Sequence, residues 1–294
     1  MPKWLLAVNR SAGRRSCDPS EIRDLIVGLG VDCDLEAPES ASAMTTMLVE
    51  AAYAGVSHFA LAGGDGTMNL AANALLTLDL DTRWTVAILP IGTGCDLLRT
   101  FGLPQDVEGA ARHLLTNETY KIDVAVLQGD WGMRYFVNVA QAGVGAAAAE
   151  TASRISRRLG AARYPLAFAG RLPGFPKANI RLTTERRTIE SEALAVIFAN
   201  AQFFAGGWNV APKATLVDGV LDIQIINARK THVAALVPKL IKGTHLRDKA
   251  VRRISAAEFT LETDPMWPVE ADGDLVGNTS VSGRVVPAAI DLKI

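Results

Sequence analysis

A strand pattern, a glycine-rich turn and a helix pattern follow one another between His58 and Leu76. The apolar run from His58 to Ala62 predicts a buried strand, and the apolar spacing from Met68 to Leu76 predicts a helix. Between them stands the pentapeptide Gly63-Gly64-Asp65-Gly66-Thr67. Glycines let a backbone approach an anion closely, and the N-terminus of a helix presents unpaired N–H groups to it. The pattern therefore predicts a phosphate-binding turn, and a tight turn with an Asx hydrogen bond is the alternative.

Asp65 makes this turn unusual, because a carboxylate in a phosphate loop repels the phosphates. A divalent cation between the carboxylate and the phosphates removes that repulsion. The turn therefore indicates a metal–nucleotide complex.

Two further loops have the same character. The segment from Pro90 to Asp96 contains Gly92, Thr93 and Gly94, follows the strand-like run 85–89 and precedes a helix predicted over 96–101. The loop from Asn9 to Arg14 follows the first strand-like run, 4–8, and offers amide, hydroxyl and cationic groups. In an α/β sheet, loops after neighbouring strands face one crevice.

The chain changes texture near residue 124. Residues 1–123 alternate strand and helix patterns, which predicts an α/β domain with a mostly parallel sheet. Residues 124–294 carry strand patterns with connections rich in Gly, Pro and Asp, which predicts an antiparallel β-sandwich domain with a helical insert over 146–172. Strands are predicted over 4–8, 32–35, 58–62, 85–89, 135–140, 179–184, 194–199, 221–226, 259–262, 280–285 and 289–294. Helices are predicted over 20–29, 40–54, 68–76, 96–101, 107–115 and 232–241. The pattern leaves open whether the last strand returns to the first domain.

Composition and cysteine spacing narrow the class of protein. Hydrophobic residues make up 49% of the 294 residues and charged ones 21%, which is typical of a folded chain. The three cysteines have no disulfide or metal spacing, so we expect a reducing cytosol. The first residues lack a signal-peptide pattern, and no apolar run reaches the roughly 20 residues that span a bilayer. We therefore expect a soluble, cytoplasmic protein.

Charge is distributed unevenly along the chain. Residues 1–125 hold 9 Lys and Arg against 16 Asp and Glu, and the remainder holds 21 against 15. Nine cations and one acid lie between Ser153 and Arg187. No nucleic-acid-reading motif accompanies them, so we expect no nucleic acid partner. An anionic membrane surface is one interpretation of this segment, and a solvated helix face is the other.

Taken together, these motifs resemble the diacylglycerol kinase catalytic domain family, which includes bacterial lipid kinases and is related to sphingosine, ceramide and, more distantly, NAD kinases. The resemblance rests on Asn-x-x-x-Gly, Gly-Gly-Asp-Gly-Thr and Pro-x-Gly-Thr-Gly-x-Asp, and it extends over nearly the whole chain. Later matching segments are 121–123, 206–207, 211–214, 218–222 and 272–274.

The resemblance implies a kinase that transfers the γ-phosphate of ATP, with Mg²⁺, to the hydroxyl of a diacylglycerol-like or sphingoid lipid. It places the active site in a cleft between the two domains and assigns Asp65, Asp96 and Asp123 to an aspartate–water–magnesium network. For Asp123 the sequence equally allows a structural capping role. The nucleotide-contacting positions that it implies are Asn9, Ser11, Gly13, Gly63, Gly64, Asp65, Gly66, Thr67, Asn69, Gly92 and Thr93.

Two residues depart from the family pattern. Asp274 stands where the family usually has Glu, the proposed general base for the lipid hydroxyl, and an Asp-Gly hairpin turn is the competing interpretation of Asp272-Gly273-Asp274. Cys95 stands where the family has Asn. A helix N-terminus could lower its pKa, whereas a packed, inert thiol is the other reading.

A second, structural magnesium site is also implied by the resemblance. Asp218 would supply a carboxylate, and Thr215 and Val220 would supply main-chain carbonyls. A plain turn before a strand is the alternative for this segment.

The sequence is compatible with three functions. The first is the lipid kinase, and the second is an NAD kinase, which shares the GGDGT turn. The third is a nucleotide- or lipid-binding homologue with little catalysis, suggested by Cys95 and Asp274. The segment 164–169 is a candidate for part of an acyl cleft. An edge strand of the sandwich could also pair two chains into a homodimer.

Overall fold

The computed structural model describes residues 2–10, 18–92 and 95–294, and these divide into two compact units. Unit 1 comprises Met1–Val124 together with Pro287–Ile294, and unit 2 comprises Ala125–Val286. We expected residues 287–294 in the second domain, but they group with unit 1. The cleft between the domains stays a prediction.

Unit 1 is built on a parallel sheet. Strand β1 (Trp4–Val8) lies between β2 (Cys33–Glu36) and β3 (His58–Gly63), and β3 pairs in parallel with β4 (Trp84–Pro90). The end of β16 (Val281–Lys293) pairs in parallel with β4, with Ile290 opposite Trp84. The last strand therefore returns to the first unit. The two strands predicted over 280–285 and 289–294 are one strand.

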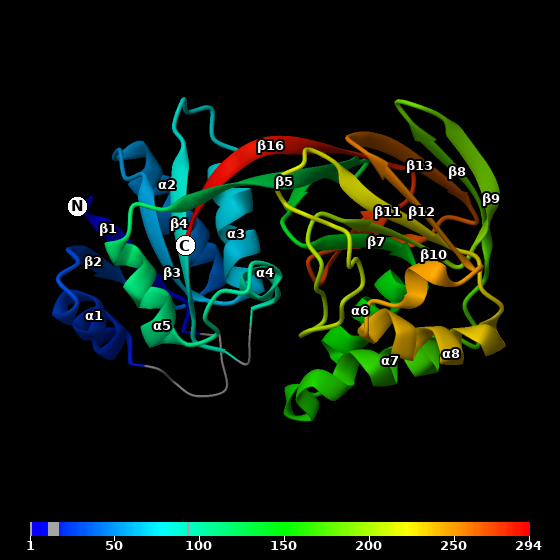
Figure 1. The fold of residues 1–294 in the computed structure, drawn as a ribbon, viewed down its shortest axis with the longest axis horizontal. Helices are drawn as coiled ribbons and strands as arrows, with labels where there is room; N and C mark the ends of the chain where they lie inside the picture. The colour runs from blue at the N-terminus through cyan, green and yellow to red at the C-terminus, as the bar shows by residue number, and fades with distance from the viewer. Residues whose placement is uncertain (1, 11–17, 93–94) are drawn as a thin grey trace. The chain divides into compact units, whose positions relative to one another are not determined.

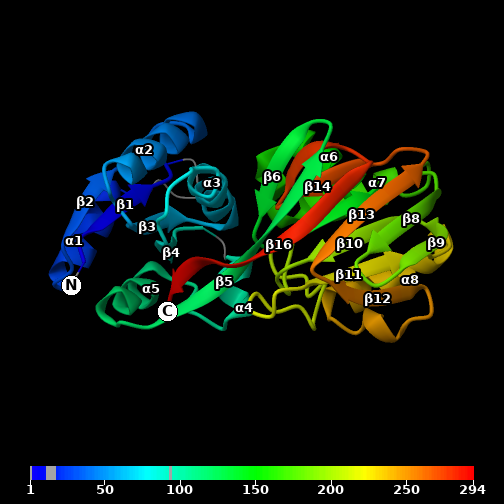
Figure 2. The same ribbon diagram turned by 90° about the horizontal axis from the view of Figure 1, so that it is seen from above.

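Helices cover both faces of this sheet. Helices α1 (Pro19–Gly28) and α5 (Val107–Arg112) lie on one face, and α2 (Ala41–Tyr53) and α3 (Asp65–Leu75) lie on the other (Figures 1 and 2). Ile22 and Ile26 of α1 pack with Leu6 and Ala60 of the strands. A sheet covered on both faces needs apolar residues at nearly every position, which explains the continuous apolar runs of the sequence. Short helices α4 (Asp96–Thr100) and η1 (His113–Leu115) complete the unit.

The C-terminal end of β16 is fastened to unit 1 by polar contacts. The Lys293 ammonium donates to the carbonyl oxygens of Thr116, at 2.7 Å, and Glu118, at 2.9 Å. The Ala288 N–H donates to the Asp123 carboxylate at 2.8 Å. These bonds join residues far apart in the chain, so unit 1 is assembled from both of its ends.

Unit 2 is an antiparallel sandwich of two sheets. In the first sheet, the beginning of β16 pairs with β13 (Glu258–Asp264), and β8 (Ala178–Thr184) and β9 (Thr188–Ala193) follow in that order. On another branch of the same sheet, β5 (Thr119–Gly129) pairs with β16, and β6 (Gly132–Phe136) pairs with β5. The second sheet has the order β12 (Val251–Ala256), β11 (Leu221–Ile226), β10 (Ala195–Ala199), β7 (Val139–Gly143), β14 (Pro268–Ala271) and β15 (Asp274–Asn278). The core lies between the sheets, where the rings of Phe198 and Phe259 stack with their centroids 3.9 Å apart. The predicted sandwich is confirmed.

Helices of unit 2 lie on the outer face of the second sheet (Figure 1). These are α6 (Val144–Arg154), η2 (Arg157–Ala162), α7 (Arg163–Arg171), α8 (Lys230–Ile241) and η3 (His245–Arg247). The predicted insert over 146–172 corresponds to α6, η2 and α7. Across the described residues, no helix combines the length and the apolar character needed to cross a membrane.

One predicted strand is divided in the structure. The run 135–140 contains the end of β6 and the start of β7, and the chain turns between them because the Asp272 carboxylate accepts the N–H groups of Val137, Asn138 and Val139 at 2.7–3.0 Å. The sequence did not indicate β5, β9, β12, β14 and β15; of these, β9, β12 and β15 carry exposed residues, whereas β14 is buried from Val269 to Ala271.

Candidate phosphate site and apolar pocket

The GGDGT turn joins β3 directly to α3. Gly63 ends the strand, Gly64 caps the helix, and the helix begins at Asp65, three residues before the predicted start. A Cβ atom on Gly63 would lie 2.1 Å from the Thr67 Oγ1 atom, so this position requires glycine. A Cβ atom on Gly64 or Gly66 would meet nothing within 4 Å. Open space therefore borders the backbone at the N-terminus of α3.

Asn9, at the start of the loop after β1, contacts this turn. The Asn9 side-chain amide donates to the Thr67 hydroxyl oxygen at 2.9 Å, and Asn9 N–H donates to the carbonyl of Ala62 at 3.0 Å. Thr67 and Asn69 are both buried. The predicted contacts Ser11, Gly13 and Thr93 lie outside the described residues.

The Asp65 carboxylate connects the turn to the second glycine loop. Its Oδ2 atom accepts the N–H of Asp96 at 2.8 Å, and its Oδ1 atom accepts the N–H of Leu97 at 3.0 Å and the Cys95 thiol at 3.1 Å. Asp65 therefore begins one helix and satisfies the free N–H groups at the start of α4. Gly92 of the same loop is exposed.

The other two predicted magnesium carboxylates have protein partners. Asp96 is buried and forms an ion pair with Arg99. Asp123 is also buried and accepts the Ala288 N–H, which is the capping role that the sequence left open. Over the described residues, no three His, Cys, Asp or Glu side chains gather closely enough to hold an ion directly. Magnesium binding by these residues stays a prediction.

Cys95 is a buried thiol. Its burial, followed by the neighbouring Asp65 carboxylate, raises the pKa of the thiol well above its ordinary value. The suggestion that the helix N-terminus lowers this pKa is wrong, since burial and the nearby negative charge outweigh the N–H groups.

Asp274 follows a tight hairpin turn in unit 2. Asp272 and Gly273 have φ angles of 49° and 96°, the two positive values that a two-residue type I′ hairpin requires. The predicted Asp-Gly turn is therefore confirmed. Asp274 is 69% exposed and pairs with Arg134 at 2.8 Å, while its role as a base stays a prediction.

The second predicted magnesium segment forms a turn before β11. Asp218 is exposed, and its Oδ1 atom accepts the N–H of Val220 at 3.2 Å. Gly219 has a φ of 72°, which explains the glycine at this position. Binding of a metal by Thr215, Asp218 and Val220 stays a prediction.

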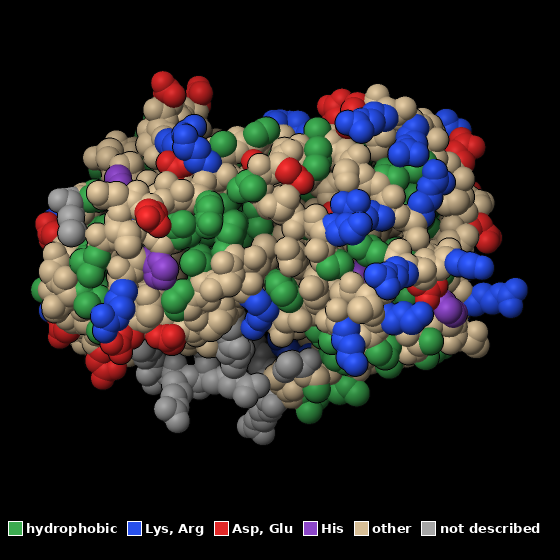
Figure 3. All heavy atoms as spheres, viewed as in Figure 1, with side chains coloured by type: hydrophobic (Ala, Val, Ile, Leu, Met, Phe, Trp, Pro, Cys, Tyr) green, Lys and Arg blue, Asp and Glu red, His purple; other side chains and the backbone are tan. Residues whose placement is uncertain are grey.

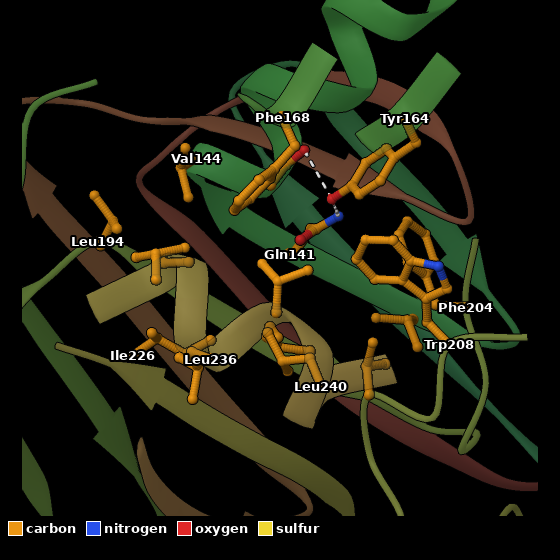
Figure 4. Close-up of a pocket in the computed structure, with 17 residues that line it drawn as sticks. Gln141, Val144, Tyr164, Phe168, Leu194, Phe204, Trp208, Ile226, Leu236 and Leu240 are labelled. Atoms are coloured by element: carbon orange, nitrogen blue, oxygen red, sulfur yellow. Dashed lines mark hydrogen bonds between the residues drawn. The ribbon is translucent and has the colours of Figure 1, made fainter. Parts of the chain in front are cut away.

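An apolar pocket lies within unit 2, between the second sheet and helices α6, α7 and α8. Its cavity has a volume of about 50 Å³. Tyr164 of α7 points into it, with the rings of Phe204 and Trp208 packed against it edge-on at 5.6 and 5.7 Å (Figure 4). Leu236 and Leu240 of α8 form another wall. The segment 164–169, predicted as part of an acyl cleft, supplies two of the lining residues, Tyr164 and Phe168.

A buried polar cluster, which the sequence patterns did not indicate, lies beside this pocket. Glu270 of β14 is fully buried and accepts a hydrogen bond from the Gln141 amide at 2.7 Å. Burial raises the pKa of Glu270 from its ordinary value of 4.5 to about 8, and Asp272 and Asp274 also act to raise it. Only the position of Glu270 beside the Asp-Gly turn could have drawn attention to it in the sequence.

Comparisons with known proteins agree with this architecture. The family model described as diacylglycerol kinase catalytic domain matches residues 3–127, and the model described as YegS C-terminal NAD kinase beta sandwich-like domain matches residues 138–294. A protein of Shewanella frigidimarina (strain NCIMB 400) named "Probable lipid kinase YegS-like" is 26% identical over 93% of this chain and 89% of its own length. A protein of the same name from Yersinia pestis (strain Pestoides F) is 25% identical over 100% of this chain and 97% of its own length.

Solved structures share the fold. A diacylglycerol kinase from Bacillus anthracis strain Sterne matches with a TM-score of 0.74 at 22% identity, over 99% of this chain and 96% of its own. Another structure from the same strain matches with a TM-score of 0.80 at 23% identity and the same coverage.

Proposed function

Because this chain belongs to the family that joins a diacylglycerol kinase catalytic domain to a YegS-type β-sandwich-like domain, we propose that it is an ATP-dependent lipid kinase. It would transfer the γ-phosphate of Mg-ATP to the hydroxyl of a diacylglycerol-like or sphingoid lipid. The observation that carries the proposal is the Asp65 carboxylate, held in a glycine turn and bonded to the second glycine loop.

The turn at the start of α3 suits the phosphates of a nucleotide. The open space at Gly64 and Gly66 leaves room for an anion beside the backbone, and the N-terminal N–H groups and dipole of an 11-residue helix attract it. The bond between Asn9 and Thr67 holds the Asn9 side chain against this turn.

The carboxylate of Asp65 fits a magnesium ion held through water. Both of its oxygens already accept protein donors, which crowds direct coordination and favours an ion held through water. Mg²⁺ keeps several waters in protein sites, and when bound it bridges phosphate oxygens and neutralises their charge. Asp96 and Asp123 are the further carboxylates that we propose for this network.

Asp274 is the proposed acceptor of the lipid hydroxyl proton. Its carboxylate is exposed, and the Arg134 guanidinium fixes its direction. Because aspartate is one methylene shorter than the glutamate of the family, the lipid hydroxyl has to approach the turn more closely.

The apolar pocket of unit 2 is the proposed acyl site. Its walls are almost wholly apolar, but a cavity of about 50 Å³ holds only a few methylene groups. A full acyl chain therefore requires α7 and α8 to move apart.

The proposed source of the lipid is an anionic membrane surface. Lys and Arg side chains gather over unit 2 in the view of Figure 3. Besides the segment 153–187, residues 229–253, which include α8, hold eight cations and one acid, Asp248. Charge reversal at Arg154, Arg157 and Arg158 should weaken binding to vesicles that contain anionic lipid. Reversal at Arg23 and Arg112 of unit 1 is the matched control, and equal losses in both variants would exclude this surface.

The deciding experiment measures phosphate transfer from labelled ATP with magnesium. Acceptors are diacylglycerol, sphingosine, ceramide and monoacylglycerol in mixed micelles, with NAD in parallel. Asp65→Asn should abolish transfer, and Asp24→Asn, an exposed aspartate of α1, should not. Labelled lipid formed by the wild type and by Asp24→Asn, but not by Asp65→Asn, supports the kinase and names the acceptor class.

Two other outcomes would replace this proposal. Label on NAD identifies an NAD kinase, an alternative favoured by the match of unit 2 to an NAD kinase-like sandwich domain. Nucleotide binding without transfer identifies a binding homologue, and turnover gained in a Cys95→Asn, Asp274→Glu double variant would locate the cause.

A further inference from the structure

A buried hydrogen-bonded chain crosses unit 2 behind the Asp274 turn. Its central member is Glu270, whose side chain is fully buried on β14. The Oε2 atom of Glu270 accepts the Gln141 amide at 2.7 Å, and its Oε1 atom accepts the backbone N–H of Gly273. A buried carboxyl with two donors is costly to remove, because its partners would lose their hydrogen bonds.

One end of this chain lies in the apolar pocket. The Gln141 amide also donates to the Tyr164 hydroxyl at 3.3 Å, and that hydroxyl donates to the carbonyl of Gly145 at 3.4 Å (Figure 4). Gln141 and Tyr164 both line the pocket. A Cβ atom on Gly145 would lie 1.9 Å from the Gln141 amide oxygen, so this glycine leaves the space that the amide occupies.

The other end of the chain lies at the proposed base. The Asp272-Gly273 turn is held from one side by the Asp272 carboxylate, which binds three N–H groups of the β6–β7 connection. From the other side it is held by Glu270, through the Gly273 N–H. Asp274 is the next residue, and its carboxylate binds Arg134.

We propose that Glu270 is a positioning residue: it fixes the turn that presents Asp274 and, through Gln141, couples that turn to Tyr164 in the wall of the apolar pocket. This inference rests on the proposed function only in the role of Asp274. An apolar chain in the pocket would press on Tyr164 and Gln141, and the Gln141 amide would pass the displacement to Glu270 and the turn.

The charge of Glu270 bears on the same coupling. Tyr164 faces it from α7, and Asp272 and Asp274 face it from its own hairpin. Its pKa of about 8 places ionisation near neutral pH. Ionised, Glu270 is a stronger acceptor for Gln141 and Gly273 and holds the turn more firmly, so the turnover number should rise with pH through this range.

Hydrogen exchange at the turn tests the positioning role without any substrate. Glu270→Leu removes the acceptor for the Gly273 N–H, and exchange of the peptide covering 272–274 should become about tenfold faster or more. Glu270→Gln restores an acceptor and should restore protection. Tyr164→Phe, which removes only the hydroxyl, should also speed exchange there. Glu262→Leu and Glu262→Gln, at an exposed position of β13, are the matched controls.

Kinetics test the consequence for catalysis. Glu270→Leu should lower kcat about tenfold or more with an unchanged KM for ATP, as expected for a displaced base. Glu270→Gln should keep the kcat that the wild type shows on the acid side of pH 8 and should lose the further rise with pH that ionisation of Glu270 produces. A pH profile of Glu270→Gln that superimposes on the wild type would overturn the proposal.

The remaining outcomes separate this inference from the proposed function. No transfer by the wild type to any lipid would overturn the kinase, and exchange alone would then decide the positioning role. If residues 272–274 of Glu270→Leu exchange hydrogen at the same rate as in the wild type, the positioning role is overturned whatever the activity of the variant. If the same residues of Tyr164→Phe exchange at the wild-type rate, the coupling to the pocket is overturned.

Discussion

Several acidic side chains accept hydrogen bonds from backbone N–H groups, among them Asp65, Asp272 and Glu270. Asp65 binds the start of α4, Asp272 binds the β6–β7 connection, and Glu270 binds its own turn. Asp65 and Asp272 reach donors that are 31 and 134 residues away in the sequence. Sequence patterns locate such carboxylates but cannot show their partners, because these bonds depend on tertiary contacts. The GGDGT turn was predictable, whereas its bond to α4 was not.

Glu270 should make the stability of unit 2 depend on pH. Because burial raises its pKa from 4.5 to about 8, the folded state keeps the proton that the unfolded state loses. Its contribution to stability is complete below about pH 4.5 and is lost as the pH rises to about 8. Glu270→Gln cannot ionise, so its free energy of unfolding should fall less between pH 5 and 8 than that of the wild type. Urea unfolding at a series of pH values measures the difference, and parallel curves would contradict it.

Cys95 should be unreactive in the folded protein. It has no exposed surface, and burial together with Asp65 raises the pKa of its thiol, which leaves little thiolate at neutral pH. Alkylation at pH 7.5, followed by peptide mass spectrometry, should label Cys95 only after denaturation. Labelling of the native protein within minutes would show that the β4–α4 loop opens readily.

Single elements of the fold were predicted best where a strand is buried on both faces. The buried strands β1, β3 and β4 were expected from apolar runs, to within one residue at each end, and the half-buried β2 was also expected to within one residue. Strands β9 and β12 were missed because both lie at the edge of a sheet, where charged residues such as Glu190 and Arg252 interrupt the apolar pattern. Two strands were predicted over 280–285 and 289–294, but the structure has the single strand β16, which accommodates Pro287.

The β3–α3 element should respond differently to a methyl group at adjacent glycines. Gly63→Ala places Cβ against the Thr67 side chain and should destabilise the protein by about 1–3 kcal/mol. Gly64→Ala meets open space at a permitted φ of −143°, so stability should change by less than about 1 kcal/mol. Its methyl group would instead stand where we propose that the phosphates bind, and ATP affinity should fall.

Thermal unfolding and ATP titration of both variants separate the two effects. Equal stability of the two variants would show that the contact between Gly63 and Thr67 relaxes. Unchanged ATP binding by a folded Gly64→Ala variant would remove this turn from the proposed nucleotide site.

At the scale of the whole molecule, strand β16 belongs to both units. Its beginning pairs with β13 in the sandwich, and its end pairs with β4. The sequence indicated two strands here but could not show that they are continuous or that the second lies in unit 1, since a parallel partner leaves no local signal.

Removal of residues 287–294 should therefore destabilise unit 1, although these residues come last in the sequence. Ile290 and Leu292 are fully buried, and each such side chain contributes about 1.5–3 kcal/mol. The deletion also leaves β4 without its neighbour and Asp123 without the Ala288 N–H. Denaturant unfolding should show the loss, and Lys293→Met, which keeps the strand, should cost less. A truncated chain as stable as the wild type would contradict this assembly.

The same strand imposes a delay on biosynthesis. Asp123 and the Ala288 N–H that it binds are 165 residues apart, and ribosomes add about 5–20 residues each second. The sheet of unit 1 therefore waits on the order of 10–30 s, during translation, for the strand that covers the edge of β4. Throughout that interval the nascent chain displays an unpaired edge, so β4 is the place where a chaperone would find it and where two unfinished chains would meet.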